Sequence, residues 1–303
     1  MEMRTYLMQT RSGLHCGVGQ GLSDIDLPTA KDSVTGHPLV PGSSIKGVLR
    51  DRFDNGSKEA LVAFGSPSGS SVDYAGALSF TDSRLVCLPV RSYFGTYAML
   101  TSRHTLRILK EELENAGLND LPDLPSFQTA QENDNFHALV CTDTRLVHQG
   151  QYAVRLLLED LDLLVDMPKE NNLADQWAEV IGRCLYTENK DQKEFSRGFA
   201  IVDDNVFDFF CEACLPVAAH NRIGKEGVVV DGGLWYEEFV PAEAVFSGSI
   251  YSQDVVRDNK TIKAKDLLNL ICSNSITIQV GGSATTGRGL VTMFFCQYQG
   301  GQP

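Results

Sequence analysis

Strand-like segments stand at both ends of the chain, and a glycine-rich loop separates the last two of them. SITIQV (275–280) and LVTMFFCQY (290–298) flank GGSATTGRG (281–289), and residues 5–9 have the same apolar character. Two more strands, meeting at a short Asp-Ser turn, are predicted within 76–92. Strands that alternate with helices and return at the end favour an α+β sheet of the ferredoxin-like type.

A helix is predicted from residue 42 onward, because apolar side chains recur at helical spacing over 45–53. The first turn of a helix carries unpaired backbone N–H groups and a partial positive charge, both of which favour phosphate binding. The segment is not a Walker loop, since Gly47 follows the lysine, and ordinary turn chemistry is the alternative. The predicted phosphate contacts are Gly42, Ser43, Ser44, Lys46 and Arg50.

The glycine-rich loop 281–289 is a second candidate for binding a phosphate or a ribose. Gly281 and Gly282 would let the ligand approach the backbone closely, and Arg288 would supply charge. Here too the alternative is a turn without a ligand.

The charge is unevenly distributed along the chain. The formal net charge is −13, which by itself argues against a nucleic-acid partner. Residues 84–110, however, carry five basic side chains, Arg91 among them, and no acidic ones, whereas 111–134 carry seven acids and no base. Aromatic residues, Tyr93, Phe94 and Tyr97, are interleaved with the basic ones. This segregation predicts one cationic face on an acidic body, and solvated helix arginines are the alternative.

Three further segments are predicted from local composition. A second helix is expected over 101–115. Residues 111–137, rich in acids and then in Asp, Asn, Pro and Gln, are predicted to form a surface insertion. NRIGKEGVVVDGGLW (221–235) has a valine run between glycine-containing turns and predicts a protruding hairpin, within a region taken as 219–240.

Length and hydropathy place the chain among globular proteins. Its 303 residues are 43% hydrophobic, which is enough to bury a sizeable core, and we expect a single domain over 1–303. No apolar stretch is long enough to span a membrane, and the first residues lack the apolar segment of a signal peptide. We therefore expect a cytoplasmic protein without a membrane partner.

The eight cysteines are scattered without the dense spacing of a disulfide-stapled domain, so reduced thiols are expected. Cys211 and Cys214 form a CxxC motif with His220 nearby. A zinc site would need a second pair of ligands at a suitable spacing, which the sequence lacks. Two cysteines one helical turn apart in the core are the favoured interpretation.

Several motifs taken together resemble the RAMP superfamily of CRISPR proteins, and within it the backbone subunits of the type III-B Cmr complex. The resemblance runs from residue 1 to about 295. The motifs that carry it are HCGVGQG, DLPTAKD, TGHPLVPGSSIKGVLR, LPVRS with GTYAMLTS, GGLWYEEFVPAE and GGSATTGRGLV.

This resemblance implies a fold, an activity and partners. The expected fold is an RRM-like or ferredoxin-like palm with an inserted finger-like lid and a thumb β-hairpin. The expected partners are guide RNA, target RNA, further copies of the chain in a helical filament and other Cmr subunits. The expected activity is endoribonuclease cleavage of the target where thumbs interrupt the guide–target duplex.

The resemblance also implies catalytic residues. Asp26 matches the aspartate of the family's Asp-x-Pro motif, and Asp24 is a less favoured neighbour outside it. Attack of a ribose 2′-OH on the adjacent phosphate needs in-line alignment, proton removal and stabilisation of negative charge. A loop carboxylate could take the proton or bind a divalent metal, Mg²⁺ or Mn²⁺, so Asp26 is also the predicted metal ligand. Without the resemblance, a turn-capping role would be the alternative.

Other site residues follow by the same matching. His15 corresponds to the histidine of the His-x-Gly-x-Gly run and could act as acid, base or phosphate ligand; without the resemblance, a core histidine is the favoured alternative. Glu237 and Glu238 resemble carboxylates of the same site, although either could be structural, and Phe239 stands where a tyrosine is expected. In the predicted thumb, Arg222 and Lys225 would face RNA.

Two alternative functions remain open at this point. A pure RNA-binding scaffold would use the same surfaces without chemistry by the carboxylates. A small-molecule phosphotransferase would use the glycine-rich loops, but the missing Walker pattern counts against it.

Overall fold

The computed structural model describes most of the chain. The described residues are 1–19, 25–53, 57–66, 75–127, 136–151, 153–166, 172–257 and 259–296. Asp24 and part of the predicted insertion, 128–135, lie outside the described residues.

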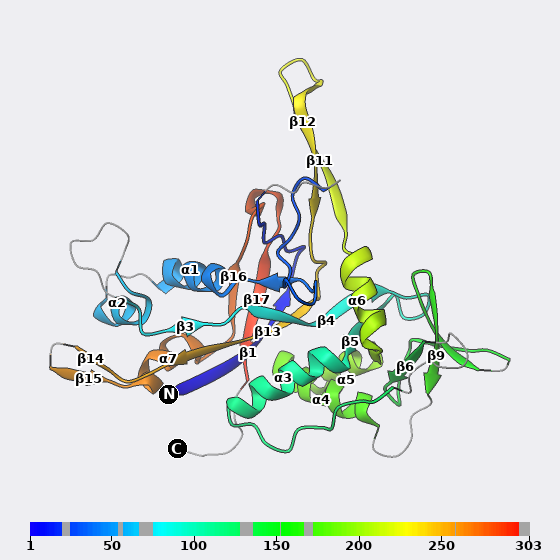
Figure 1. Ribbon diagram of the computed structural model, residues 1–303, viewed down its shortest axis with the longest axis horizontal. Coiled ribbons are helices and arrows are strands. Elements are labelled where there is room, and N and C mark those ends of the chain that lie inside the picture. Colours follow the sequence, from blue (N-terminus) through cyan, green and yellow to red (C-terminus); the bar gives the residue numbers. More distant parts are fainter. Residues whose placement is uncertain are drawn as a thin grey trace.

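The centre of the molecule is the long first strand, β1 (Glu2–Thr10). It pairs antiparallel with β13 (Val245–Ser252) on one side and with β17 (Leu290–Phe295) on the other. On its far side β13 pairs antiparallel with β4 (Ser83–Arg91). The chain therefore joins its two ends at the middle of one sheet, as Figure 1 shows.

Two helices complete this unit. α1 (Gly42–Phe53) follows β1, and α7 (Ala264–Cys272) follows β13. The order β17-β1-β13-β4, with one helix after the first strand and one after the third, is a βαββαβ arrangement. The predicted α+β architecture is confirmed, and its core has the expected ferredoxin-like connectivity.

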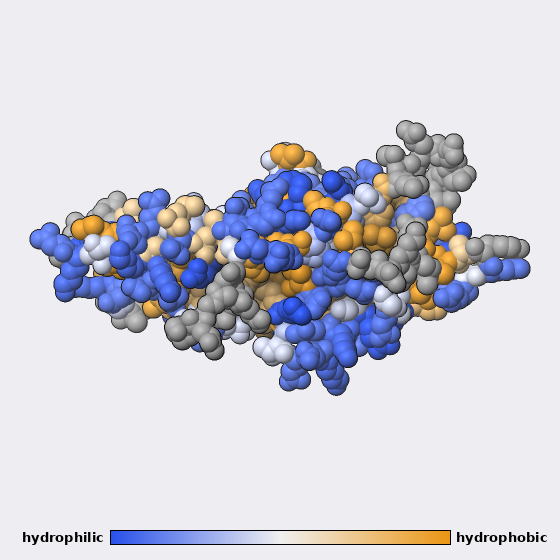
Figure 2. All heavy atoms as spheres, turned by 90° about the horizontal axis from the view of Figure 1, so that it is seen from below, coloured by the Kyte–Doolittle hydropathy of each residue, from blue (hydrophilic) through white to orange (hydrophobic). Residues whose placement is uncertain are grey.

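The sheet is buried on both faces. In β1, Tyr6 and Met8 belong to the apolar cluster that α1 and α7 help to form, whereas Leu7 belongs to a second cluster on the opposite face. That second cluster is built by α3 (Arg103–Asn115) and α4 (Leu173–Leu185). An RRM leaves this face of its sheet open to stack RNA bases, so RNA cannot bind here in that manner. Seen from below, the surface is mostly hydrophilic with smaller hydrophobic groups, because the helices turn their apolar sides inward (Figure 2).

The sheet extends well beyond this unit. From β4 it continues through β5 (Tyr97–Ser102), β10 (Phe199–Val202), β6 (His137–Val140), β9 (Leu161–Asp166), β8 (Val154–Leu158) and β7 (Val147–Gln149). The pairs of β5 with β10 and of β6 with β9 are parallel, which makes the sheet mixed. Three short strands add to the unit: β16 (Ile276–Gln279) pairs with β17 at its other edge, β2 (Leu39–Val40) pairs with β4, and β3 (Ser79–Phe80) pairs with β13.

Three more helices pack against the sheet or against the helices that cover it. They are α2 (Lys58–Phe64), α5 (Asn189–Arg197) and α6 (Asp204–Ala213). Phe207 and Phe210 of α6 are fully buried in the same cluster as Tyr6. One continuous core therefore supports both the central unit and its extension.

The predicted hairpin is present and projects from the body. β11 (Val217–Ile223) pairs with β12 (Val229–Glu238), and the ribbon extends away from the sheet at the top of Figure 1. A smaller hairpin, β14 (Val255–Arg257) with β15 (Lys260–Ile262), comes directly before α7 and lies at the left of Figure 1.

The predicted helix over 101–115 begins at Arg103 instead. Thr101 and Ser102 are the last residues of β5, and the Ser102 side chain caps the helix by accepting the N–H of Thr105. The predicted insertion, 111–137, thus starts inside α3 and ends at the first residue of β6. Between them, 116–127 has neither helix nor strand, but four of its apolar side chains pack against the cluster of α3 and α4.

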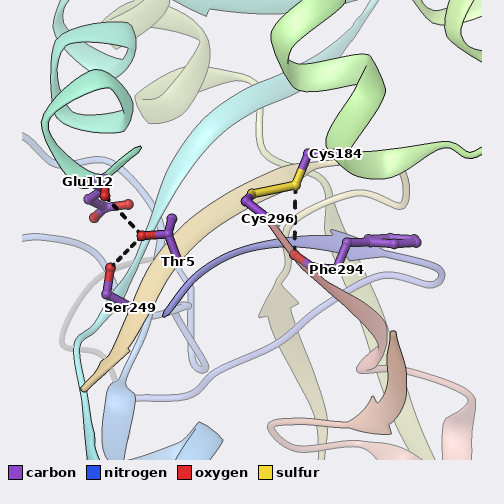
Figure 3. The surroundings of a disulfide bond; sticks show 6 residues. All are labelled: Thr5, Glu112, Cys184, Ser249, Phe294 and Cys296. Atoms are coloured by element: carbon purple, nitrogen blue, oxygen red, sulfur yellow. Dashed lines mark hydrogen bonds between the residues drawn. A yellow bond between two sulfur atoms is a disulfide. The ribbon is translucent and has the colours of Figure 1, made fainter. Parts of the chain in front are cut away.

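The cysteine prediction was wrong in one respect. Cys184, near the end of α4, forms a disulfide with Cys296, which directly follows β17 (Figure 3). The two residues are 112 positions apart in sequence but only 5.5 Å apart between Cα atoms, a proximity that cysteine spacing could not reveal. The other six cysteines are free thiols.

The favoured interpretation of the CxxC motif holds for Cys211 but not fully for Cys214, which is half-buried at the end of the helix. Cys211 is buried in α6, where burial raises the pKa of its thiol, and Cys214 caps the same helix. Among the described residues, no group of three or more His, Cys, Asp or Glu side chains could hold a metal ion. Within the same part of the chain, no helix is both long and apolar enough to cross a membrane.

We predict that the disulfide stabilises the fold. Replacing Cys296 with Ser should lower the free energy of unfolding by about 2–4 kcal/mol, because the bond closes a loop of more than a hundred residues. Urea unfolding of the wild type and the variant, each with and without a reductant, would measure the effect. A reductant should leave the Cys184→Ser/Cys296→Ser double variant unchanged; equal stability of wild type and variant would contradict the prediction.

Candidate functional site

Three segments meet at the end of the sheet from which the hairpin projects (Figure 1). They are the loop after β1, the glycine-rich loop between β16 and β17, and the base of the β11–β12 hairpin. Leu14 and Val240 exchange backbone hydrogen bonds, and the Gly289 N–H donates to the Gly13 carbonyl. Leu27 forms a parallel bridge to Glu237. Four of the matched motifs, far apart in sequence, therefore lie together at this end of the sheet.

His15 lies inside this junction. Its side chain is buried, and its Nδ1 lies 2.8 Å from the carbonyl oxygen of Glu238. A carbonyl oxygen only accepts, so Nδ1 carries a hydrogen and donates it. The His15 carbonyl accepts the N–H of Gly282, and a Cβ on Gly281 would lie 2.2 Å from that same oxygen. The two glycines thus allow the loops to touch.

Asp26 is exposed beside the hairpin base. One carboxylate oxygen, Oδ2, accepts the backbone N–H of Tyr236 at 2.8 Å. The next residue, Leu27, donates its N–H to the Tyr236 carbonyl, which holds the loop along β12. Among the described residues, Oδ1 has no hydrogen-bond partner. The side chain is therefore anchored at one oxygen and open at the other.

Glu237 and Glu238 are both buried, unlike Asp26. Glu238 is 2.9 Å from the Lys31 ammonium and accepts the backbone N–H of Thr29 at 3.1 Å. Glu237 accepts the Ser283 hydroxyl at 2.8 Å and forms an ion pair of 2.8 Å with Arg288. Each carboxylate is thus neutralised by a cation from a different loop.

Arg288 is consequently not a free phosphate ligand. Its guanidinium lies 3.6 Å above the ring of Phe239, and only 15% of its side chain is exposed. His220 was considered in the sequence only as a zinc ligand. It stacks on Trp235 and lies 3.9 Å from Glu237. Lys31 and Trp235 lie within matched motifs, but the sequence analysis assigned none of these three residues a role at this site, because the contacts that bring them here are long-range.

The phosphate site predicted at the start of α1 makes contacts within the chain. Gly42, which is buried, donates its N–H to the Asp82 carboxylate at 2.8 Å, so an acidic side chain already caps this helix end. Lys46 donates to the Leu78 carbonyl at 2.9 Å, and burial, with a smaller effect of Arg50, lowers its pKa. Ser43 is exposed, while Ser44 donates its N–H to the Pro41 carbonyl.

The other predicted RNA contacts are exposed. Arg91 lies at the end of β4, and Arg222 and Lys225 lie on the projecting hairpin. The same hairpin exposes several large apolar side chains, a feature that the sequence analysis did not identify. They are Val217, Ile223, Val228, Val229, Leu234 and Tyr236.

Some basic side chains of the predicted cationic face already make contacts within the chain. Arg107 pairs with Glu111 at 2.7 Å, and Lys110 donates to the Pro122 carbonyl. The basic run and the acidic run that follows it therefore neutralise each other in part across α3.

Comparison with protein families gives a match over most of the chain. The model of the RAMP superfamily matches residues 7–292. The Cmr endoribonuclease Cmr4 of the Pyrococcus furiosus CRISPR system is 31% identical, with 95% of each chain covered. The Cmr4 subunit from Saccharolobus solfataricus is 21% identical, with 96% of each covered.

Solved structures agree with this chain over nearly its full length. Oligomeric Cmr4 from Pyrococcus furiosus superposes with a TM-score of 0.71 at 22% identity, covering 99% of both chains. A chain of the type III-B Cmr-beta complex bound to cognate target RNA gives a TM-score of 0.70 at 18% identity, covering 97% of both. At these identities the superpositions establish the fold.

Gly42 and Gly47 of α1 form a matched pair for testing whether the start of this helix has a packing role, because only Gly42 lies against another part of the backbone. In Gly42→Ala the new Cβ would lie 2.5 Å from the Phe80 carbonyl oxygen, so we expect a loss of about 1–3 kcal/mol in the free energy of unfolding. In Gly47→Ala the Cβ meets nothing within 4 Å, and we expect a gain of about 0.5–1 kcal/mol. Thermal unfolding of both variants would measure this, and an unchanged Gly42→Ala would refute the packing role.

Proposed function

The chain belongs to the RAMP superfamily, and on that premise we propose that it is the backbone subunit of a type III-B RNA-guided complex that cleaves target RNA. The proposal rests on the 31% identity to a Cmr endoribonuclease over almost the whole chain, with a matching fold. A complex of this kind would act in the cytoplasm.

The observation that carries the catalytic part is the exposed, half-anchored carboxylate of Asp26. The Tyr236 N–H holds Oδ2, and Oδ1 has no partner among the described residues, so one oxygen can face a ribose or phosphate. Cleavage would follow attack of a 2′-OH on its adjacent phosphate, with Asp26 accepting the 2′-OH proton; the bond to the 5′-oxygen of the next nucleotide breaks, that oxygen takes a proton from water, and a 2′,3′-cyclic phosphate remains. Among the matched acids, Glu237 and Glu238 are buried and paired, which leaves Asp26 as the open one.

A divalent metal would fit this site only if RNA supplied other ligands. In the described part of the chain, Asp26 offers one open carboxylate oxygen and no cluster of ligands surrounds it. Mg²⁺ commonly binds one or two carboxylates together with substrate phosphates and water, and Mn²⁺ accepts similar oxygen ligands. When bound, the metal would stabilise the negative charge that develops on the phosphate.

The remaining surfaces suit a filament on a guide strand. We propose that the β11–β12 hairpin is the thumb, with Arg222 and Lys225 near RNA and its exposed apolar side chains at the interrupted base pairs. Copies of the chain would stack head to tail along the guide RNA, with other Cmr subunits at the ends. A related Cmr4 has been solved in oligomeric form.

Asp26 is tested in the assembled complex with two variants. Asp26→Asn keeps an acceptor for the Tyr236 N–H but removes the charge, and Asp26→Ala removes both. Both should reduce single-turnover cleavage of complementary RNA by about 10²-fold or more, with guide binding and assembly retained. Normal cleavage by either variant would mean that Asp26 is not catalytic and would favour a scaffold role.

The metal is tested separately. Chelation with EDTA should stop cleavage by the assembled complex, and Mg²⁺ or Mn²⁺ should restore it, while guide RNA stays bound. Cleavage at an undiminished rate in EDTA would reject the metal and leave proton transfer by Asp26 as the mechanism.

A further inference from the structure

Glu237 and Glu238 are neighbours at the end of β12 and leave the strand on opposite sides. Only 3% and 5% of their side chains are exposed. A carboxylate buried to this degree cannot touch RNA that arrives from solvent. The effect of each glutamate must therefore pass through the groups that it holds.

Glu238 holds the loop that carries Asp26. Its Oε1 pairs with Lys31 at 2.9 Å and its Oε2 accepts the Thr29 N–H, while its own N–H donates to the Leu27 carbonyl. These contacts hold Leu27, Thr29 and Lys31, which come shortly after Asp26 in the chain, against β12. The position of the Asp26 carboxylate thus depends on Glu238.

Glu237 holds the glycine-rich loop on the other side. Oε2 accepts the Ser283 hydroxyl, and Oε1 lies 2.8 Å from Arg288 Nε, whose N–H does not point at the oxygen, so this contact is an ion pair without a hydrogen bond. Gly13 leaves room for the arginine, since a Cβ there would lie 2.5 Å from its guanidinium. The loop that Glu237 fixes also contacts His15 through Gly282.

We propose that Glu237 and Glu238 are positioning residues that together clamp the two loops of the site onto the hairpin base. Arg288 and Lys31 then serve as their counter-ions and not as RNA ligands. Breaking one partner of a buried pair leaves an uncompensated charge, so each pair strongly favours a single arrangement of its loop. The proposal rests on the proposed function only where it concerns cleavage.

Hydrogen–deuterium exchange of the full-length chain tests the clamp directly. Glu238→Gln should speed exchange about ten- to hundredfold at residues 27–31, and Glu237→Gln should do so at 282–289, each leaving the other loop and β1 unchanged. Adding Lys31→Met or Arg288→Met, respectively, should restore most of the protection, because the stranded cation is removed. Glu111→Gln is the matched control, since its pair with Arg107 is exposed on α3.

Cleavage by the assembled complex provides the second measurement. Glu238→Gln should lower the single-turnover rate about 10²-fold at saturating target with target affinity within about twofold, and Lys31→Met should rescue it in part. Unchanged exchange in both variants, or faster exchange spread over the whole chain, would overturn the clamp. If the wild-type complex fails to cut RNA, the proposed function fails, while the exchange experiment still decides the clamp.

Discussion

The structure depends on the burial of β1 from both sides. A strand with Tyr6 and Met8 on one face and Leu7 on the other can sit only at the middle of a sheet that is covered twice. Its partners β13 and β17 come from the last sixty residues. The sheet therefore forms only when the C-terminal part of the chain returns to the N-terminal strand. This closure also places the loop after β1 beside the glycine-rich loop before β17.

Because both faces are covered, the functional surface has to lie at an end of the sheet. That end collects loops, and loops need internal contacts to hold a precise arrangement. Here the contacts are close backbone approaches at Gly281 and Gly13, together with the two buried carboxylates of β12. The candidate site therefore lies at the rim of the sheet and not on its face.

Much of this arrangement could be predicted from local sequence. Periodicity located α1 and the strands at both ends, and turn chemistry located the hairpin, because these signals depend on near neighbours. The boundary of α3 was missed by two residues, since Ser102 serves as both the last strand residue and the helix cap. The Cys184–Cys296 disulfide and the covered sheet face were missed because both depend on contacts between distant segments.

The candidate site shows the same division. The family motifs placed His15, Asp26 and the two glutamates together, but residue type alone could not separate an open carboxylate from a buried one. The structure distinguishes them by burial, since Asp26 is exposed and the two glutamates are buried. Glu237 and Glu238 are neutralised by Arg288 and Lys31, and Asp82 by the start of α1, so these acids add little repulsion toward a phosphate backbone. A chain of net charge −13 can therefore present the exposed Asp26 without two further unpaired carboxylates, those of Glu237 and Glu238, beside it.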